Sequence, residues 1–257
     1  MMIRLSIFLI CLSVLWCISP PAQAQQFSQG QMISEARSKN RTDARVLFQA
    51  WRSLQRQNSQ RIQRISLRNR LDSRFDGPGG TWSSTVDMNV SGYASSNSWQ
   101  NDVTGFRSDG ESLPKSNWNT MIDQWRSLLS EQFASIVEDP ALPLQLFDQM
   151  RPSGNAKEER INGAMHWRIE MVPNRGNVPY QRVTLWVHQE VGYLTRSRAV
   201  MADRRSSIEV VTDYKRVRGI DVPVKRRFDG KVQSRRRNRI STRFFDVRGE
   251  YTNYSFR

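Results

Sequence analysis

Cysteine, histidine and long apolar runs are scarce in this chain of 257 residues. Its two cysteines, Cys11 and Cys17, are too few for a disulfide scaffold or a cysteine-ligated zinc site. Its two histidines, His166 and His188, are too few for a multi-histidine metal centre. A hydrophobic content of 38% and a mean hydropathy of −0.63 exclude a polytopic membrane protein but allow a hydrophobic core. We therefore expect neither a metal nor a cofactor.

The longest apolar run lies at the amino terminus and has the pattern of a secretory signal. Leu5–Ile18 is apolar, Arg4 precedes it, and Ala22–Ala24 follows as a small-x-small cleavage pattern. The run is shorter than the ~20 residues of a membrane-spanning helix, which favours cleavage over a membrane anchor. We expect residues 1–24 to be a cleaved signal peptide and residues 25–257 to form a single exported, periplasmic domain. This domain would be free of cysteine and carry a net charge of +14.

The mature part opens with a helical pattern and continues with strand patterns. Asp43 is a capping residue, and apolar residues at helical spacing follow it, which predicts a first helix. Apolar and polar residues then alternate over 65–72 and, after a Gly-Pro-Gly-Gly turn, over 82–91. The alternation predicts two half-buried strands, and a third strand is expected over 98–107.

The most apolar part of the mature sequence is a second helical pattern over 116–137. Pro140 ends it, and a further short helical turn is expected within 142–150. We expect one continuous helix with a wide apolar stripe, formed by Trp118, Met121, Ile122, Trp125, Leu128, Leu129, Phe133, Ile136 and Val137. Such a stripe either packs on a sheet in the ordinary way or also lines a binding pocket, and both possibilities stay open.

From Lys157 onward the sequence predicts only strands and turns. Asn162-Gly163 is a hairpin signal, and single glycines separate the later segments. The connections are short, so we expect an antiparallel meander, since parallel strands need long crossovers. The predicted strands include 167–171, 183–187, 193–201, 207–217, 222–228 and 239–246.

Three segments of this region carry recognisable patterns. Asn162–Pro173 has the form NG…W.i.m.P, Asp213–Pro223 the form DY..v.G..vP, and Tyr251–Phe256 the form y.N..F. Their order over roughly residues 157–256 resembles that of outer-membrane lipoprotein-sorting proteins, the LolA/LolB-like superfamily. The resemblance implies a mainly β fold with α, in which a curved antiparallel sheet, an incomplete β-barrel, is covered by helices. It also implies an apolar pocket for acyl chains between the sheet and the helices.

The residue types of the second helical pattern suit such a pocket. Bulky aromatic and methionine side chains adapt to an irregular acyl ligand, and each buried methylene contributes about 0.8 kcal/mol. With the resemblance, this makes the helix and the strand at 82–91 the candidate lining. The candidate ligand-binding residues are Trp82, Val86, Met88, Trp118, Met121, Trp125, Leu129, Phe133, Leu146 and Phe147.

Basic residues are concentrated near the carboxyl terminus, where thirteen lie between Lys215 and Arg248 against three acidic residues. They form either a solvated strand face or a docking surface for lipid head groups, lipopolysaccharide phosphates or an acidic protein. Nucleic acid would satisfy the same electrostatics, but export disfavours it and no nucleic-acid motif is present. The candidate docking residues are Lys225, Arg226, Arg227, Arg235, Arg236, Arg237 and Arg239.

The sequence contains no recognisable catalytic motif, neither a Gly-x-Ser-x-Gly elbow nor a Walker loop nor a metal-spaced histidine pair. His166 is expected on the surface and His188 at a strand end. We expect a monomeric, non-enzymatic periplasmic carrier or sensor that binds lipid or lipoprotein acyl chains. The alternative is an exported basic interaction module with a filled core that binds anionic partners without a lipid ligand. A hydrolase whose site the sequence does not reveal is the third possibility.

Overall fold

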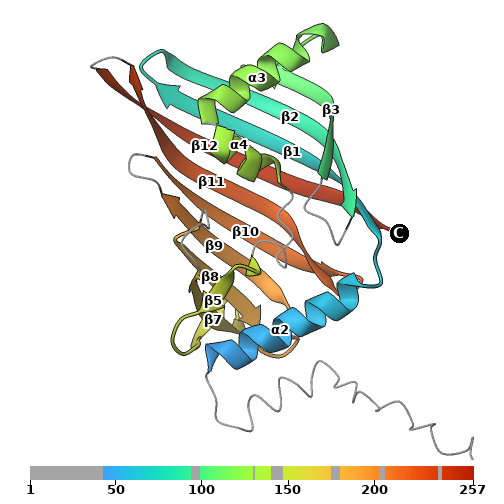
Figure 1. The fold of residues 1–257 in the computed structure, drawn as a ribbon. Helices are drawn as coiled ribbons and strands as arrows, with labels where there is room; N and C mark the ends of the chain where they lie inside the picture. Colours follow the sequence, from blue (N-terminus) through green and yellow to red (C-terminus); the bar gives the residue numbers. More distant parts are fainter. Residues whose placement is uncertain are drawn as a thin grey trace, which may run out of the picture.

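The computed structural model describes residues 43–93, 99–129, 131–139, 147–174, 180–202, 206–236 and 239–257. The expected signal peptide, residues 1–24, lies outside the described residues. The described chain forms a twelve-stranded antiparallel sheet with helices on one face (Figure 1). The strands are β1 (Arg64–Gly77), β2 (Gly80–Tyr93), β3 (Trp99–Ser108), β4 (Glu111–Ser112), β5 (Met150–Pro152), β6 (Lys157–Ile161), β7 (Ala164–Pro173), β8 (Arg182–His188), β9 (Leu194–Ala202), β10 (Ser207–Val217), β11 (Ile220–Arg236) and β12 (Arg239–Phe256).

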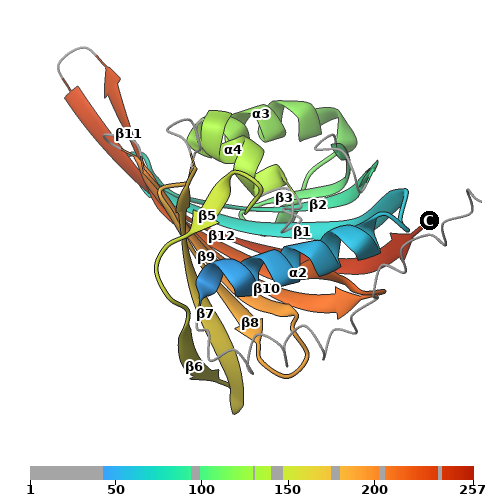
Figure 2. The ribbon, with the colours of Figure 1, turned by 60° about the horizontal axis from the view of Figure 1, so that its bottom comes forward.

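The strand order joins the two halves of the chain in one sheet. It runs β4-β3-β2-β1-β12-β11-β10-β9-β8-β7-β5, with β6 also paired to β7. The predicted antiparallel meander is confirmed from β6 to β12, and the amino-terminal strands form a second one. The two are joined where β1 pairs with β12, in a register that includes Leu71 opposite Gly249. The expected fold class, a curved antiparallel sheet covered by helices, is confirmed (Figure 2).

Alternation along the strands separates a concave inner face from an outer face. In β1 every odd-numbered residue from Ile65 to Phe75 is buried, including the polar Asn69 and Ser73, while the even-numbered residues are exposed or half-buried. A strand turns successive side chains to opposite faces, so this period of two gives one apolar face. The inner face and the helices share one core, and the outer face carries charged side chains such as Arg74.

Among the described residues, three helices, with a short 3-10 turn before the second, cover the inner face. They are α2 (Ala44–Ser59), α3 (Trp118–Leu129) and α4 (Glu131–Glu138), with the turn η1 at Lys115–Asn117. Helix α2 begins after Asp43, whose carboxylate accepts the Arg45 amide, as predicted for a capping residue. Helix α3 lies over β1 and β2, α4 lies over β12, and α2 crosses the opposite end of the sheet (Figures 1 and 2).

The expectation of one continuous helix over 116–137 is wrong. The Arg126 Nε donates to Glu138 Oε1 at 2.6 Å, whereas twelve residues along one α-helix would separate these positions by about 18 Å. The chain therefore bends between α3 and α4, so that both short helices press their apolar sides on the sheet. Leu142, Leu144 and Leu146, which were expected in the following turn, lie outside the described residues.

The β11–β12 hairpin extends beyond its neighbours. The last pair that joins β11 to β10 is Lys231 opposite Ser207, and the last that joins β12 to β1 is Phe244 opposite Asp76. Residues further out pair only with each other, down to Arg236 opposite Arg239. The two strands consequently project from the sheet as a two-stranded ribbon (Figures 1 and 2). Both are longer than the sequence predicted.

Candidate functional site

Apolar side chains from α3 and α4 fill the space above β1, β2 and β12. Trp125, Leu129, Phe133 and Val137 are each at most 2% exposed. The Trp125 indole N–H donates to Ser73 Oγ on β1 at 2.9 Å, which fixes α3 over the middle of that strand. The helical stripe therefore packs on the sheet as its spacing predicted.

The structure places nine of the ten predicted pocket residues in or against this core. Val86, Met88, Trp125, Leu129, Phe133 and Phe147 are buried, and Trp82, Trp118 and Met121 are partly buried against them. Leu146 lies outside the described residues. Phe147 packs against Trp51 of α2, with ring centroids 6.4 Å apart, and therefore lies beneath α2 and not beneath α3 and α4. The lining role of all ten stays a prediction.

Polar side chains stand at the centre of this apolar layer. Asn69 of β1 lies opposite Tyr251 of β12, and Arg226 of β11 is next to them; each is at most 3% exposed. We call these three residues the inner polar cluster. Asn69 lies against the Tyr251 hydroxyl, but its amide nitrogen and oxygen have no well-formed hydrogen bond within the described part of the chain. Buried amides are normally satisfied, so this one is available to a polar atom that enters the layer.

Arg226 connects the sheet to the end of helix α4. Its Nη1 donates to the carbonyl oxygen of Ile136 at 3.3 Å, to that of Asp139, and to the Tyr251 hydroxyl at 3.4 Å. Its guanidinium also lies 4.5 Å from the centre of the Phe228 ring. The last carbonyls of a helix lack partners within the helix, so a basic side chain there holds the helix end in place.

Burial changes the ionisation of the groups around this contact. Burial alone lowers the pKa of Arg226, but Tyr251, Tyr180 and Asp139 outweigh it, so the pKa is raised and the side chain remains charged. Burial raises the pKa of Tyr180 and of Tyr214 to about 12. The cluster is thus a fixed cation among neutral phenols at any physiological pH.

A second buried polar group fastens α2 to the turn between β10 and β11. The Asp221 side chain is fully buried and its Oδ2 accepts Trp51 Nε1 at 2.9 Å and Gln55 Nε2 at 2.8 Å. The same oxygen accepts the Leu194 amide at 2.9 Å, and Oδ1 accepts Arg216 Nε at 2.8 Å. One carboxylate therefore joins a helix, two strand turns and a cation.

Gly219 explains why this turn of the DY..v.G..vP pattern contains glycine. Its φ is +82°, and a Cβ atom there would lie 2.9 Å from the Asn58 side chain. Asn58 donates to the Gly219 carbonyl at 2.8 Å and lies one turn beyond Gln55 on α2. Left-handed backbone and close approach both require glycine. The pattern therefore marks a docking point for α2.

The two histidines are neighbours across β7 and β8. His166 and His188 have ring centroids 5.1 Å apart, and His188 stacks on Tyr193. The expectation that His166 lies on the surface is wrong, because the residue is 3% exposed and its Nδ1 is 3.0 Å from the Ala164 carbonyl. The His188 ring on β8 packs against it. His188 ends its strand, as expected.

We expect the folded protein to lose stability below about pH 6.5, the ordinary histidine pKa. Burial lowers the pKa of His166, and the nearby charges of His188 and Arg196 lower it further. The hydrogen bond to Ala164 and the charge of Glu159 raise the pKa but do not outweigh this effect. Below pH 6.5 the His166 side chain is protonated in the unfolded chain before it is protonated in the folded chain. The stability contributed by neutral His166 is therefore complete above this pH and is lost as the pH falls. Urea unfolding across this range measures the effect. His166→Gln should remove most of it and His188→Gln should not; an equal loss in both variants would contradict it.

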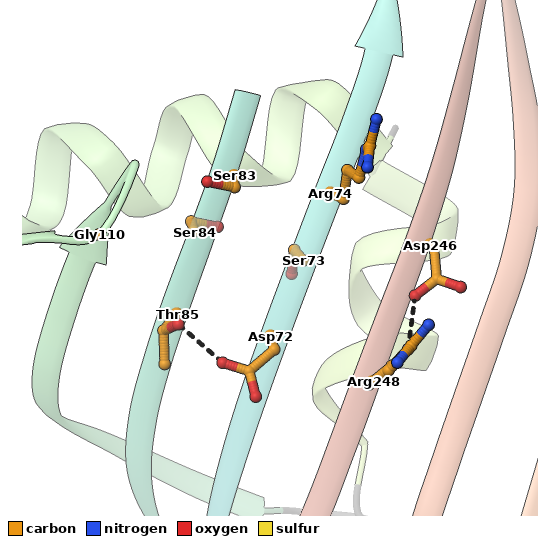
Figure 3. A pocket seen from close by; sticks show the side chains of 9 residues that line it. All are labelled: Asp72, Ser73, Arg74, Ser83, Ser84, Thr85, Gly110, Asp246 and Arg248. Carbon is orange, nitrogen blue, oxygen red and sulfur yellow. Dashed lines mark hydrogen bonds and ion pairs between the residues drawn. The ribbon is translucent and has the colours of Figure 1, made fainter. Parts of the chain in front are cut away.

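A hollow of about 490 Å³ lies on the outer face of the sheet, on the side away from the helices (Figure 3). Its charged residues are Asp72, Arg74, Asp246 and Arg248. Arg248 Nε is 3.1 Å from Asp246, and Asp72 accepts the Thr85 hydroxyl at 2.7 Å. These mutually neutralising groups make a polar surface that does not suit an acyl chain.

The basic residues predicted to dock an anionic partner are divided between the two faces. Lys225 and Arg227 are exposed on the outer face, where Arg227 pairs with Asp229 at 2.9 Å and Asp246 at 3.4 Å. Arg226 is buried on the inner face, so its assignment to the docking surface is corrected. Alternation along β11 could have shown this, because Phe228 faces the core two residues later.

The other predicted docking residues belong to the projecting ribbon. Arg235 and Arg236 lie in β11 and Arg239 lies in β12, beyond the last pairs with β10 and β1. Arg237 lies outside the described residues. Two bulky apolar side chains that the sequence analysis did not single out, Ile240 and Phe244, are exposed on the same ribbon.

Within the described ranges, no helix is long and apolar enough to cross a membrane. In the same ranges, histidine, cysteine and carboxylate side chains do not form a group of three or more that could hold a metal ion.

No family model and no curated protein matches the chain. Its fold is similar to that of a DUF1329 family protein from Desulfovibrio piger (13% identity, TM-score 0.38, covering 81% of this chain and 92% of that one). It is also similar to a domain named as an outer membrane lipoprotein-sorting protein from Vibrio parahaemolyticus (9%, 0.38, 80% and 92%). A third similar structure is a LolA superfamily protein from Nitrosomonas europaea (11%, 0.34, 80% and 92%).

Proposed function

We propose that the chain is a non-enzymatic periplasmic carrier or sensor that binds the acyl chains of a lipid or lipoprotein. The ligand would lie between the inner face of the sheet and helices α3 and α4. The observation that carries this proposal is the composition of that layer. Aromatic, leucine and methionine side chains meet there from both sides, around an inner polar cluster whose Asn69 amide is unsatisfied among the described residues.

Binding would proceed by a shift of the helix pair. Polar contacts between this pair and the sheet include Trp125 with Ser73, Arg226 with the end of α4, and Arg243 Nη1 with the Leu128 carbonyl at 3.4 Å. When α3 and α4 move away, an acyl chain replaces their apolar contacts, at about 0.8 kcal/mol for each methylene buried. An ester or phosphate oxygen of the ligand would accept hydrogen bonds from the inner polar cluster.

The alternative is an exported interaction module that binds anionic partners and holds no lipid. The observation that favours it is the close filling of the layer, where Leu129 and Val137 are 0% exposed. In this case α3 and α4 would be permanent parts of the core, and the basic residues of β11 and β12 would carry the function.

Lipid recovery separates the two proposals. We expect the protein purified from its own periplasm to release lipid on native mass spectrometry and solvent extraction, and to bind the fluorescent fatty acid cis-parinaric acid. Met121→Glu, which places a charge at a half-buried position of α3, should weaken probe binding at least about tenfold because the charge must be desolvated. Thr120→Glu, at the exposed neighbouring position, should leave it unchanged.

Both variants should show the far-UV circular dichroism spectrum of the wild type. Their free energies of unfolding should lie within about 1 kcal/mol of the wild-type value. If no lipid is recovered and the wild-type protein does not bind the probe, the carrier proposal fails and the interaction module remains. If both variants bind the probe equally well, the site is not beneath α3.

A further inference from the structure

The projecting end of the β11–β12 hairpin carries both basic residues and exposed apolar side chains. We define it as residues 231–236 and 239–244 and call it the arm. Its residues include five basic ones, Lys231, Arg235, Arg236, Arg239 and Arg243, and no acidic one. Elsewhere on the outer face, arginines alternate with carboxylates and pair with them, as Arg70 does with Asp72 and Arg198 with Glu209. The arm's own sequence therefore carries five positive charges and no negative charge.

Apolar side chains accompany this charge. Ile240 is 64% exposed and Phe244 is 57% exposed. Both are even-numbered positions of one strand, so they point to the same face, about 13 Å apart along β12. Phe245, the next residue after Phe244, is 4% exposed and packs on Phe133. Because successive residues of a strand face opposite sides, Phe244 lies on the side away from the core.

Ile240 and Phe244 are not among the described side chains that pack in or against the hydrophobic core. Beyond the pairs Lys231–Ser207 and Phe244–Asp76, the described strands β11 and β12 pair only with each other. Bulky apolar groups that remain in water on a projecting ribbon mark a surface that another body covers. That body must accept positive charge and apolar groups together.

We propose that the arm docks the protein on the surface of an anionic phospholipid bilayer, with Ile240 and Phe244 inserted at the level of the head groups. A bilayer meets both requirements at once. Its phosphates attract the basic residues, and the boundary between head groups and acyl chains accepts the two apolar side chains. An acidic polypeptide would satisfy the charge but leave the apolar pair in water. This deepens the docking part of the proposed function and does not depend on the acyl pocket.

Vesicle binding tests the proposal on the chain from Gln25 onward. Cosedimentation is measured with phosphatidylcholine vesicles, with and without phosphatidylglycerol, at low and high salt. We expect binding only when phosphatidylglycerol is present, and weakening by salt. The variant Arg235→Gln, Arg236→Gln, Arg239→Gln should bind at least about tenfold more weakly. The charge-matched control, Arg151→Gln, Lys157→Gln, Arg182→Gln, removes three exposed cations from β5, β6 and β8 and should bind within about twofold of the wild type.

The apolar pair is tested separately. Ile240→Ser with Phe244→Ser should reduce binding about fivefold, while Tyr93→Ser, at an equally exposed aromatic on β2, should not. The expected mature chain has no cysteine, so Ile240→Cys can carry an environment-sensitive dye. Its emission should shift to the blue on phosphatidylglycerol vesicles, and a dye at Tyr93→Cys should not shift.

Absence of vesicle binding by the wild type would overturn the proposal, as would equal weakening by the arm variant and its charge-matched control. Salt-sensitive binding to polyglutamate without binding to vesicles would overturn it in favour of an acidic protein partner. Because Met121→Glu is expected to weaken acyl binding and lies outside the arm, vesicle binding of this variant should persist. Failure of the arm and failure of the pocket are therefore distinguishable.

Discussion

Replacing Asp221 by alanine is expected to lower the free energy of unfolding by about 4 kcal/mol. The carboxylate is fully buried and accepts hydrogen bonds from Trp51, Gln55, Arg216 and the Leu194 amide. Its removal leaves these donors without their acceptor, and each unsatisfied buried donor costs about 1–3 kcal/mol. Urea unfolding followed by circular dichroism measures the loss.

Asp213 provides the matched control in the same DY..v.G..vP segment. Its carboxylate also binds an arginine, Arg196 at 2.8 Å, but both side chains are about 40% exposed. Asp213→Ala should therefore cost less than about 1 kcal/mol. If Asp221→Ala does not fold, Asp221→Asn keeps an acceptor oxygen and should lose about half as much. Equal losses at Asp213 and Asp221 would contradict the role assigned to burial.

Local periodicity was sufficient to predict the first helix and the long strands, although β11 and β12 are longer than predicted and Met150, expected in a helical turn, begins β5. In β1 and β2 apolar and polar residues alternate except at the buried Asn69, Ser73 and Ser84, and each strand buries one face. Asp43 likewise marks the start of α2, since a cap is a local interaction. The resemblance added the curved sheet and its helical cover. These features depend on neighbouring residues or on the order of the patterns that carry the resemblance.

Contacts between distant residues could not be predicted from local patterns. Asp221 and Trp51 are 170 positions apart, and no local pattern pairs a carboxylate in one turn with an indole in a far helix. The pairing of β1 with β12 is equally distant. A count of charges also could not show that Arg226 is buried while its neighbours Lys225 and Arg227 are exposed, because a count does not record on which side of the strand a residue lies.

The break between α3 and α4 is a further case in which tertiary packing decides. The apolar stripe from Trp118 to Val137 has a continuous helical period, and nothing in its residue types requires a bend. The sheet below supplies the reason, because two short helices cover more of its width than one straight helix does. The ion pair of Arg126 with Glu138 joins the two helices after the bend.

Arg226→Met is expected to release helix α4 while the sheet stays folded. Methionine retains an apolar stem that packs on Phe228, so the loss of the buried charge itself carries little global cost. The bonds to the Ile136 and Asp139 carbonyls are lost, at about 1.5 kcal/mol each for a charged donor. Amide hydrogen exchange in 135–139 should therefore accelerate about 100-fold, since each 1.4 kcal/mol is a factor of ten.

Hydrogen exchange resolved by segment distinguishes release of α4 from general loosening. Amides of β1 and β12 should retain their protection in Arg226→Met, and the free energy of global unfolding should fall by less than about 2 kcal/mol. Arg243→Met is the control, because Arg243 donates to the Leu128 carbonyl of α3 at 3.4 Å from a half-buried position and should change exchange in 135–139 by less than about tenfold. If the helix pair moves to admit an acyl chain, cis-parinaric acid should also enter Arg226→Met faster than the wild type. Unchanged exchange in α4, or equal acceleration throughout the sheet, would show that Arg226 does not hold the helical cover in place.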